Sequence, residues 1–189
     1  MNRREVISRI SLLLGGTVVG ANVFINSGCS PSDKQVNLLF KQSDIALFDE
    51  ISDTILPATA TPGAKAAKVG EFMSMMVLDC YTKKDQKVFT DGVQSFQDAF
   101  NKQYNTSFIK GTAEQRTAFL NTLDKEQKTY QASKKKDDPS HYFRMMKELT
   151  LLGFFTSEVG ATKALRYIEV PGRFDGSAPY KKGEKAWAT

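Results

Sequence analysis

The stretch KDQKVFTDGVQSFQDAFNKQY, residues 84–104, decides the fold class of this chain. Its large apolar residues recur at spacings of four, three, four and four, at Phe89, Val93, Phe96, Phe100 and Tyr104. Positions at these spacings lie on one face of an α-helix. The stretch therefore predicts an amphipathic helix that buries an aromatic face against other elements.

Two helices are predicted before this stretch. The first has Ser43 as its N-cap, ends before Pro57, and turns one apolar face inward through Ile45, Phe48, Ile51 and Ile55. The second covers residues 69–81 and carries a stripe of Phe72, Met73, Met76, Val77 and Cys80. Methionine fills irregular gaps in cores, so the stripe indicates packing, with Cys80 as a buried thiol.

Three helices are predicted after the stretch. Thr112 and Gln115 fit a capping box that opens a helix to about residue 130, with inward side chains at Phe119, Leu120 and Leu123. Pro139 suits the first turn of a fifth helix, whose inner face holds Tyr142, Met146, Leu149 and Gly153. A short sixth helix is expected over residues 157–167. Because no period-two run is long enough for a strand, we predict a single all-α domain of five or six helices over residues 43–170.

The last residues, 171–189, have no helical period. Glycine and proline interrupt them at Pro171, Gly172, Gly176, Pro179 and Gly183. We call this segment the arm; fully extended, it reaches about 60 Å. Its aromatic residues, Phe174, Tyr180 and Trp187, are spaced six and seven apart, which fits neither a strand face nor a helix stripe. Two interpretations are open: the aromatic residues anchor a partner, or the arm folds back and Trp187 fills a gap in its own domain.

Residues 1–28 have the three parts of an export signal. Arg3 and Arg4 form a twin-arginine pair, and the apolar region after them, residues 10–25, is diluted by glycine. The segment resembles a twin-arginine signal; the alternative is a Sec signal with an accidental Arg-Arg pair. Small residues before Cys29 resemble a lipobox, although Asn26 departs from its usual aliphatic residue. We therefore expect lipid on Cys29, a tether over residues 29–42, and a periplasmic protein held at the membrane surface.

Charge and composition exclude several classes of function. The chain has a net charge of +5, of which residues 1–28 contribute +2 and the rest +3, dispersed among acids. This distribution does not indicate nucleic-acid binding. The one histidine, His141, is expected near a helix start and exposed to solvent, with no evident metal or nucleophile set around it. Cys-x-x-Cys-His and Gly-x-Gly-x-x-Gly after a strand are both absent. We predict no catalytic, cofactor-binding or metal-binding residues in this chain.

Two segments carry a family resemblance. ISDTILPATATPGAKAAKVGEFM, residues 51–73, and GFFTSEVGATKALRY, residues 153–167, followed by VPGRFDG, resemble the two signatures of the gluconate 2-dehydrogenase subunit 3 family. With the helices between them, the resemblance spans roughly residues 43–187. It implies a small accessory subunit of a membrane-associated dehydrogenase of the glucose–methanol–choline type, acting on sugars or sugar acids. In that family the large subunit holds FAD, and a cytochrome c subunit often takes the electrons.

The resemblance leads to a functional hypothesis. We expect a non-catalytic subunit that aids the export, stability and membrane association of a flavoprotein. We expect the partner interface to include Pro57, Pro62, Gly63, Tyr167, Pro171, Gly172, Phe174, Tyr180 and Trp187. The loop of residues 56–63 has a second interpretation, a plain connection between helices. The alternative function is a stand-alone lipoprotein that binds a sugar or peptide in a pocket lined by the Met and Phe stripe; an independent hydrolase is disfavoured because no triad is available.

Overall fold

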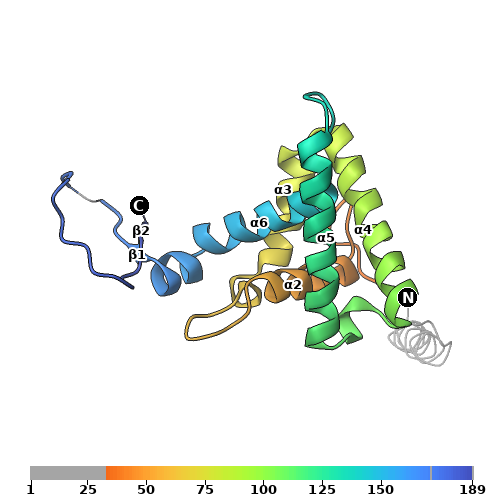
Figure 1. The fold of residues 1–189 in the computed structure, drawn as a ribbon, viewed down its shortest axis with the longest axis horizontal. Coiled ribbons are helices and arrows are strands. Elements are labelled where there is room, and N and C mark those ends of the chain that lie inside the picture. Colours follow the sequence, from red (N-terminus) through yellow and green to blue (C-terminus); the bar gives the residue numbers. More distant parts are fainter. Residues whose placement is uncertain (1–32, 171, 189) are drawn as a thin grey trace, which may run out of the picture. The chain divides into compact units, whose positions relative to one another are not determined.

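The computed structural model describes residues 33–170 and 172–188, and the elements below belong to the unit Gln35–Thr189. Five α-helices form most of it: α2 (Gln42–Ile55), α3 (Val69–Cys80), α4 (Lys83–Tyr104), α5 (Ala113–Ser133) and α6 (Tyr142–Thr156) (Figure 1). Two 3₁₀ turns, η1 (Ala64–Ala67) and η2 (Phe108–Lys110), connect them. The predicted all-α domain with a non-helical arm is confirmed.

The core of the bundle is aromatic. Phe48, Phe89, Phe96 and Phe100 are fully buried. Their rings meet edge to face, with centroids 5.7 Å apart for Phe48 and Phe89 and 5.1 Å apart for Phe100 and Phe119 of α5. This geometry adds a favourable electrostatic contribution to the burial of the rings. The aromatic face predicted for residues 84–104 is therefore confirmed as the centre of the core.

Side chains satisfy the ends of several helices. Thr112 and Gln115 form the predicted capping box of α5: the Gln115 amide donates to Thr112 Oγ1 at 3.3 Å, and the Thr112 amide donates to Gln115 Oε1 at 2.9 Å. Gln86 is buried and donates to the carbonyls of Val77 and Leu78 near the end of α3. Carbonyls at a helix end have no partner in their own helix, so these bonds remove a burial cost.

Ion pairs tie the helices together at two places. Glu50 of α2 pairs with Lys65 of η1 and, at 2.5 Å, with Arg116 of α5. Burial by itself raises the pKa of Glu50, but these two partners outweigh it and lower the pKa below its usual value. Asp124 of α5 accepts from Lys128 and, across to α6, from Lys147 at 2.6 Å. These bonds lower the pKa of Asp124 to about 2.

Some predictions at helix ends are wrong. The N-cap of α2 is Lys41, so Ser43 lies within the first turn. Cys80 is exposed, because it is the last residue of α3 and the packed face ends before it. The expected sixth helix is shorter than predicted: residues 158–164 are helical, including the π-helical turn η3 (Gly160–Ala164), and a two-residue strand, β1 (Arg166–Tyr167), follows.

The start of α6 also differs from the prediction. Pro139 lies before the helix, and its carbonyl accepts from the Tyr130 hydroxyl at 3.0 Å. His141 is the N-cap of α6, and its Nδ1 accepts from the Phe143 amide. The ring is half-buried, stacked on Tyr142, and burial lowers the pKa of His141. The expectation of an exposed histidine was therefore wrong.

Candidate partner-binding surface

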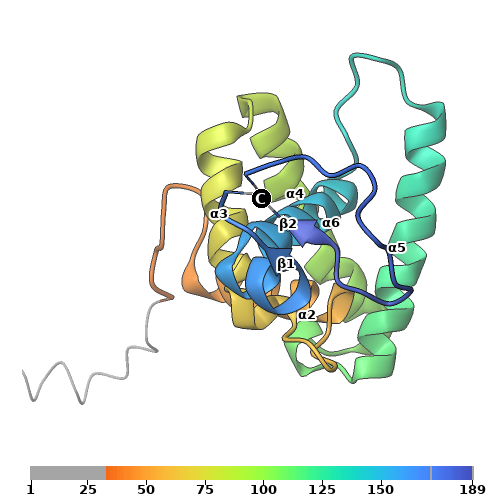
Figure 2. The same cartoon turned by 90° about the vertical axis from the view of Figure 1, so that its left-hand side faces the viewer.

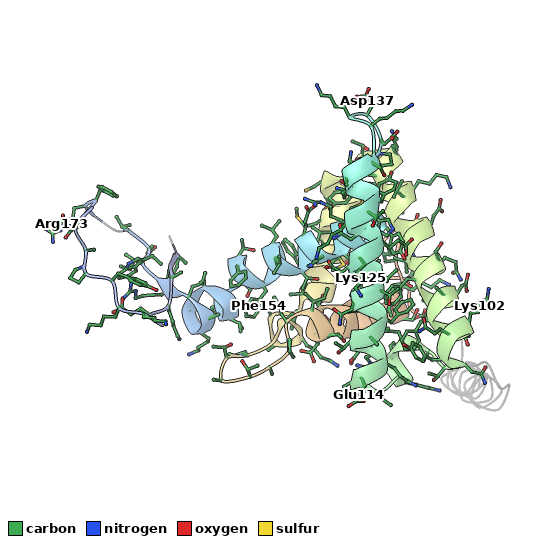
Figure 3. All side chains as sticks on the ribbon, in the orientation of Figure 1. Lys102, Glu114, Lys125, Asp137, Phe154 and Arg173 are labelled. Atoms are coloured by element: carbon green, nitrogen blue, oxygen red, sulfur yellow. The ribbon has the colours of Figure 1, made fainter. Side chains whose placement is uncertain are left out.

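The burial of apolar side chains changes along helix α6. Its first part buries Phe143, Met146 and Leu149 in the bundle. Its last part leaves apolar side chains partly exposed at Leu151, Leu152 and Phe155. Figure 1 shows α6 leaving the bundle and leading to η3 and the arm, and Figure 3 shows Phe154 near this end of the helix. Apolar surface therefore continues from the bundle towards the arm.

Two glycines allow the close packing at this end of the molecule. A Cβ on Gly153 would lie 2.6 Å from a ring carbon of Phe72 in α3, so glycine lets α6 and α3 approach. A Cβ on Gly160 would lie 1.8 Å from the carbonyl oxygen of Phe154, which no larger residue tolerates. The carboxy-terminal signature thus contains residues whose role is packing.

The two ends of the last segment are joined. Strand β1 pairs in parallel with β2 (Trp187–Ala188), with Arg166 opposite Trp187 (Figure 2). The Arg166 amide donates to the Ala186 carbonyl at 2.8 Å, and the Ile168 amide donates to the Ala188 carbonyl at 2.9 Å. We call this pairing and the side-chain contact across it the clasp.

The side chains of Arg166 and Trp187 strengthen the clasp. The Arg166 guanidinium carbon lies 3.5 Å from the centroid of the Trp187 ring. This cation–π stacking is worth about 0.5–2 kcal/mol. Glu184 lies 3.6 Å from Arg166 Nη1, and Lys185 Nζ donates to the Lys163 carbonyl. Residues 168–186 therefore form a loop whose two ends are held together.

The loop closed by the clasp displays its aromatic residues. Phe174 is 95% exposed and Tyr180 is 81% exposed, and Tyr167 and Val170 also face solvent. Gly172 and Gly183 have φ angles of 70° and 89°, the left-handed region that glycine adopts without strain. Residues 163–189 hold six basic and three acidic residues, so they carry the entire net charge of +3 found after the leader. This surface combines exposed aromatic groups with positive charge.

The loop between α2 and η1, residues 56–63, is the other expected contact region. Pro57 is exposed, Pro62 is half-buried, and Gly63 is buried. A Cβ on Gly63 would lie 2.6 Å from the Ala58 nitrogen, so glycine allows the loop to close on itself. The following turn, η1, packs against α2, α3 and α6. The segment connects two helices, and Pro57 is the one of these three expected contact residues that is exposed.

Some of the expected interface residues lie in one region of the structure, and others lie elsewhere. Tyr167 and Trp187 lie in the clasp, and Gly172, Phe174 and Tyr180 lie in the loop it closes. Pro171 and the leader residues Arg3, Arg4 and Cys29 lie outside the described residues. Arg166 was missed, since a stacking partner 21 residues away leaves no local signal in a sequence.

The described residues were also examined for sites that could bind a metal ion or a small molecule. Within residues 33–170 and 172–188, no group of three or more His, Cys, Asp or Glu side chains is placed to hold a metal ion. Three shallow clefts have volumes of about 210, 220 and 190 Å³. Met73 and Val77 of the stripe are fully buried and line none of these three. Met73 and Val77 therefore fill the core, whereas Cys80 at the end of the stripe lines one of the clefts.

The family of the chain is established by comparison. A family model described as gluconate 2-dehydrogenase subunit 3 matches residues 42–172, more than half of the chain. The chain belongs to the gluconate 2-dehydrogenase subunit 3 family. Searches among curated proteins and solved structures found no match. The name of the family indicates a subunit of a dehydrogenase complex and therefore implies association with other subunits.

The family match covers only part of the structure. It begins at the first residue of α2 and ends at Gly172. Phe174, Tyr180 and Trp187 lie beyond it, so the family match covers the bundle and β1 and leaves out most of the loop and β2. No helix among the described residues is both long and apolar enough to cross a membrane.

Proposed function

We propose that this chain is the non-catalytic small subunit of an exported FAD-dependent dehydrogenase that oxidises sugars or sugar acids. The large subunit holds the FAD and the substrate, and a cytochrome c subunit takes the electrons. The small subunit carries the flavoprotein through export by its own leader and supports its stability. Lipid on Cys29 holds the complex at the periplasmic face of the membrane.

The observation that carries this proposal is the exposed aromatic loop closed by the clasp. Phe174 and Tyr180 lose little solvent contact within their own chain. Exposed aromatic side chains that become buried in a complex commonly dominate its binding energy. The membership of a dehydrogenase-subunit family indicates what kind of partner supplies the missing contacts. The loop therefore binds the flavoprotein, with Phe174 and Tyr180 as separate anchors.

The charge of the loop specifies the partner surface further. Arg173, Lys181 and Lys182 flank the two aromatic anchors. Complementary charge at the rim of an interface speeds association and suppresses wrong partners. We expect the flavoprotein to present apolar pockets surrounded by acidic residues. Association should consequently slow as the salt concentration rises.

Purification of the native complex tests the proposal. The chain is captured from its host with an antibody against the helical bundle, and the co-purifying proteins and their absorption spectrum are recorded. We expect a large second polypeptide and a flavin spectrum, whereas the chain separated from it is colourless and has no dehydrogenase activity. A chain recovered without any second polypeptide contradicts the proposal.

Export and anchoring have separate tests. Arg3→Lys combined with Arg4→Lys should leave both this chain and the flavoprotein in the cytoplasm, because the partner depends on this leader. Cys29→Ser should release the exported complex into the soluble fraction. If the flavoprotein still reaches the periplasm with the leader disabled, the carrier role is wrong; if the Cys29→Ser protein stays in the membrane fraction, the lipid anchor is wrong.

A further inference from the structure

The described chain begins with a small closed loop, residues 35–41. Gln35 and Lys41 form an antiparallel bridge at its base. Inside the loop, the Val36 and Asn37 amides donate to the Phe40 carbonyl at 3.0 and 3.2 Å. Asn37 Oδ1 accepts from the amides of Leu39 and Phe40, both at 2.9 Å. These bonds fix the backbone of a loop only seven residues long.

The loop is also fixed to the bundle. Phe40 is buried, and its ring meets those of Phe48 and Phe89 edge to face, with centroids 5.2 and 5.9 Å away. Asn37 Nδ2 lies 3.5 Å from the Ser74 carbonyl, which brings the loop against α3. In Figure 2 the start of the described chain, drawn in orange, passes beside α3. The loop therefore projects from the bundle at a defined position.

The tip of this loop is apolar and faces solvent. Leu38 is 89% exposed, and Val36 on the same loop and Met75 in α3, next to Ser74, are about half exposed. Because the Leu38 side chain is exposed to water, it contributes no burial energy to the stability of the fold. Burying one such side chain is worth about 1.5–3 kcal/mol. Transfer of the tip into an apolar environment outside the chain is therefore favourable.

The position of Leu38 in the sequence identifies that environment. It lies nine residues after Cys29, so it reaches no farther than about 30 Å from that residue. With lipid on Cys29, the tip is always close to the membrane surface. Residues 33–44, the loop with its flanking residues, contain two lysines and two aspartates, so this region has no net charge and its binding depends on apolar contact.

We propose that loop 35–41 inserts Leu38, together with Val36 of the same loop, into the interfacial region of the bilayer. The proposal rests on the lipid anchor at Cys29 included in the proposed function. The inserted tip adds an apolar contact with the bilayer to the lipid anchor, and a further apolar contact strengthens membrane binding. The inserted tip also fixes which side of the bundle faces the membrane, because Phe40 and Asn37 hold the loop to the core.

Fluorescence in vesicles tests this insertion. The acylated full chain is reconstituted into vesicles of equimolar phosphatidylcholine and phosphatidylglycerol, with or without brominated acyl chains. Leu38→Trp adds a reporter at the tip, and Ile109→Trp, at another exposed apolar residue, is the matched control. Trp187 of the unmodified chain gives the background emission. We expect the Leu38→Trp emission to shift to the blue and to be quenched by bromine, whether or not salt is added, with no change for Ile109→Trp.

Each other outcome has a defined meaning. If the chain floats with the vesicles but Leu38→Trp keeps an aqueous emission, the insertion is overturned and the lipid anchor stands. If a reporter in the loop closed by the clasp, Val170→Trp, is quenched while Leu38→Trp is not, that loop is the membrane contact. If the Leu38→Trp emission responds to the flavoprotein without vesicles, the tip binds protein. A chain that does not float overturns both the anchor and the insertion.

Discussion

Phenylalanine occurs in both the helical bundle and the arm, in opposite surroundings. Phe48 of α2 has no exposed surface and touches the rings of Phe40 and Phe89. Phe174 of the arm is almost entirely exposed, and Figure 3 shows its neighbour Arg173 in the loop beyond the clasp. Residue type alone therefore does not distinguish a core from a binding surface; the periodicity around it does.

Charge divides the molecule in the same way. Residues 29–162 contain equal numbers of acidic and basic residues, whereas residues 163–189 have a net charge of +3. In the bundle, charges serve internal pairs such as Glu50 with Arg116. In the arm, Arg173 and Lys182 are exposed beside aromatic side chains. Charges of the bundle are thus paired between its helices, whereas the arm exposes cations that are available to the partner that we propose.

Removing the arm is the most severe test of this difference. A chain that ends after Val170 loses β2, Phe174 and Tyr180, but no buried core residue of the bundle. We expect complete loss of flavoprotein capture, with the helical circular dichroism and the melting temperature unchanged. A truncated protein that melts markedly lower yet still captures the flavoprotein would assign the arm to stability and contradict the proposed interface.

A matched pair of substitutions sharpens the comparison at single residues. Phe48→Ala removes a fully buried ring, which costs about 3–5 kcal/mol of unfolding free energy. Phe174→Ala removes an exposed ring, which should change that free energy by no more than about 0.5 kcal/mol. Flavoprotein binding should show the reverse, with a loss of about 2 kcal/mol or more for Phe174→Ala. Urea unfolding and a binding titration measure the two quantities; equal destabilisation by both variants would contradict the comparison.

The bundle could be predicted from the sequence because its signals are local. Apolar residues three and four apart define a helix face without knowledge of the fold, and the faces of α4 and α5 were predicted correctly. Errors arose where a neighbouring element decides the environment. Cys80 follows the period of α3 but lies where packing has ended, and His141 is covered by Tyr130 from α5.

The candidate site could be predicted only in part, for the same reason. The lack of period in residues 171–189 correctly indicated a non-helical arm, whereas the sequence left open whether Phe174 and Tyr180 are exposed, as they are. The clasp joins Arg166 to Trp187 across 21 residues, and such a contact has no sequence period. The expected helix over residues 157–167 is present but ends at Ala164, because residues 166–167 form β1, which pairs with β2. Contacts between residues far apart in the sequence therefore could not be predicted from the sequence.

Opening the clasp should have a smaller effect, confined to the arm. Arg166→Ala removes the stacking on Trp187, at a cost of about 1 kcal/mol to loop closure. Limited proteolysis should then cut residues 168–186 faster, while the melting temperature of the bundle stays the same. Arg166→Lys is the matched control for charge, because lysine keeps the cation without the planar group that stacks. If neither variant changes the cleavage rate, the clasp does not hold the loop.

The last expected effect is on the pH dependence of the stability of the bundle. Substitutions in the arm should leave this pH dependence unchanged. Lys128 and Lys147 lower the pKa of Asp124 to about 2, compared with 3.8 for an ordinary aspartate. Between these two values the unfolded chain binds a proton at this position that the folded chain does not bind. The contribution of Asp124 is therefore complete above about pH 4 and is lost as the pH falls towards 2. Because the carboxylate is partly solvated, we expect it to be about 1 kcal/mol.

Asp124→Asn measures this contribution directly. The variant should be less stable than the unmodified chain at neutral pH, and the difference should shrink as the pH falls from about 4 to about 2, since the unmodified carboxylate becomes neutral there. Asp91→Asn is the matched control, because Asp91 pairs with Lys87 on the surface of a single helix and surface pairs contribute little. Chemical unfolding at a series of pH values gives both curves. A difference between Asp124→Asn and the unmodified chain that is the same at all pH values would mean that packing between α5 and α6, and not the ion pair, is what the substitution removes.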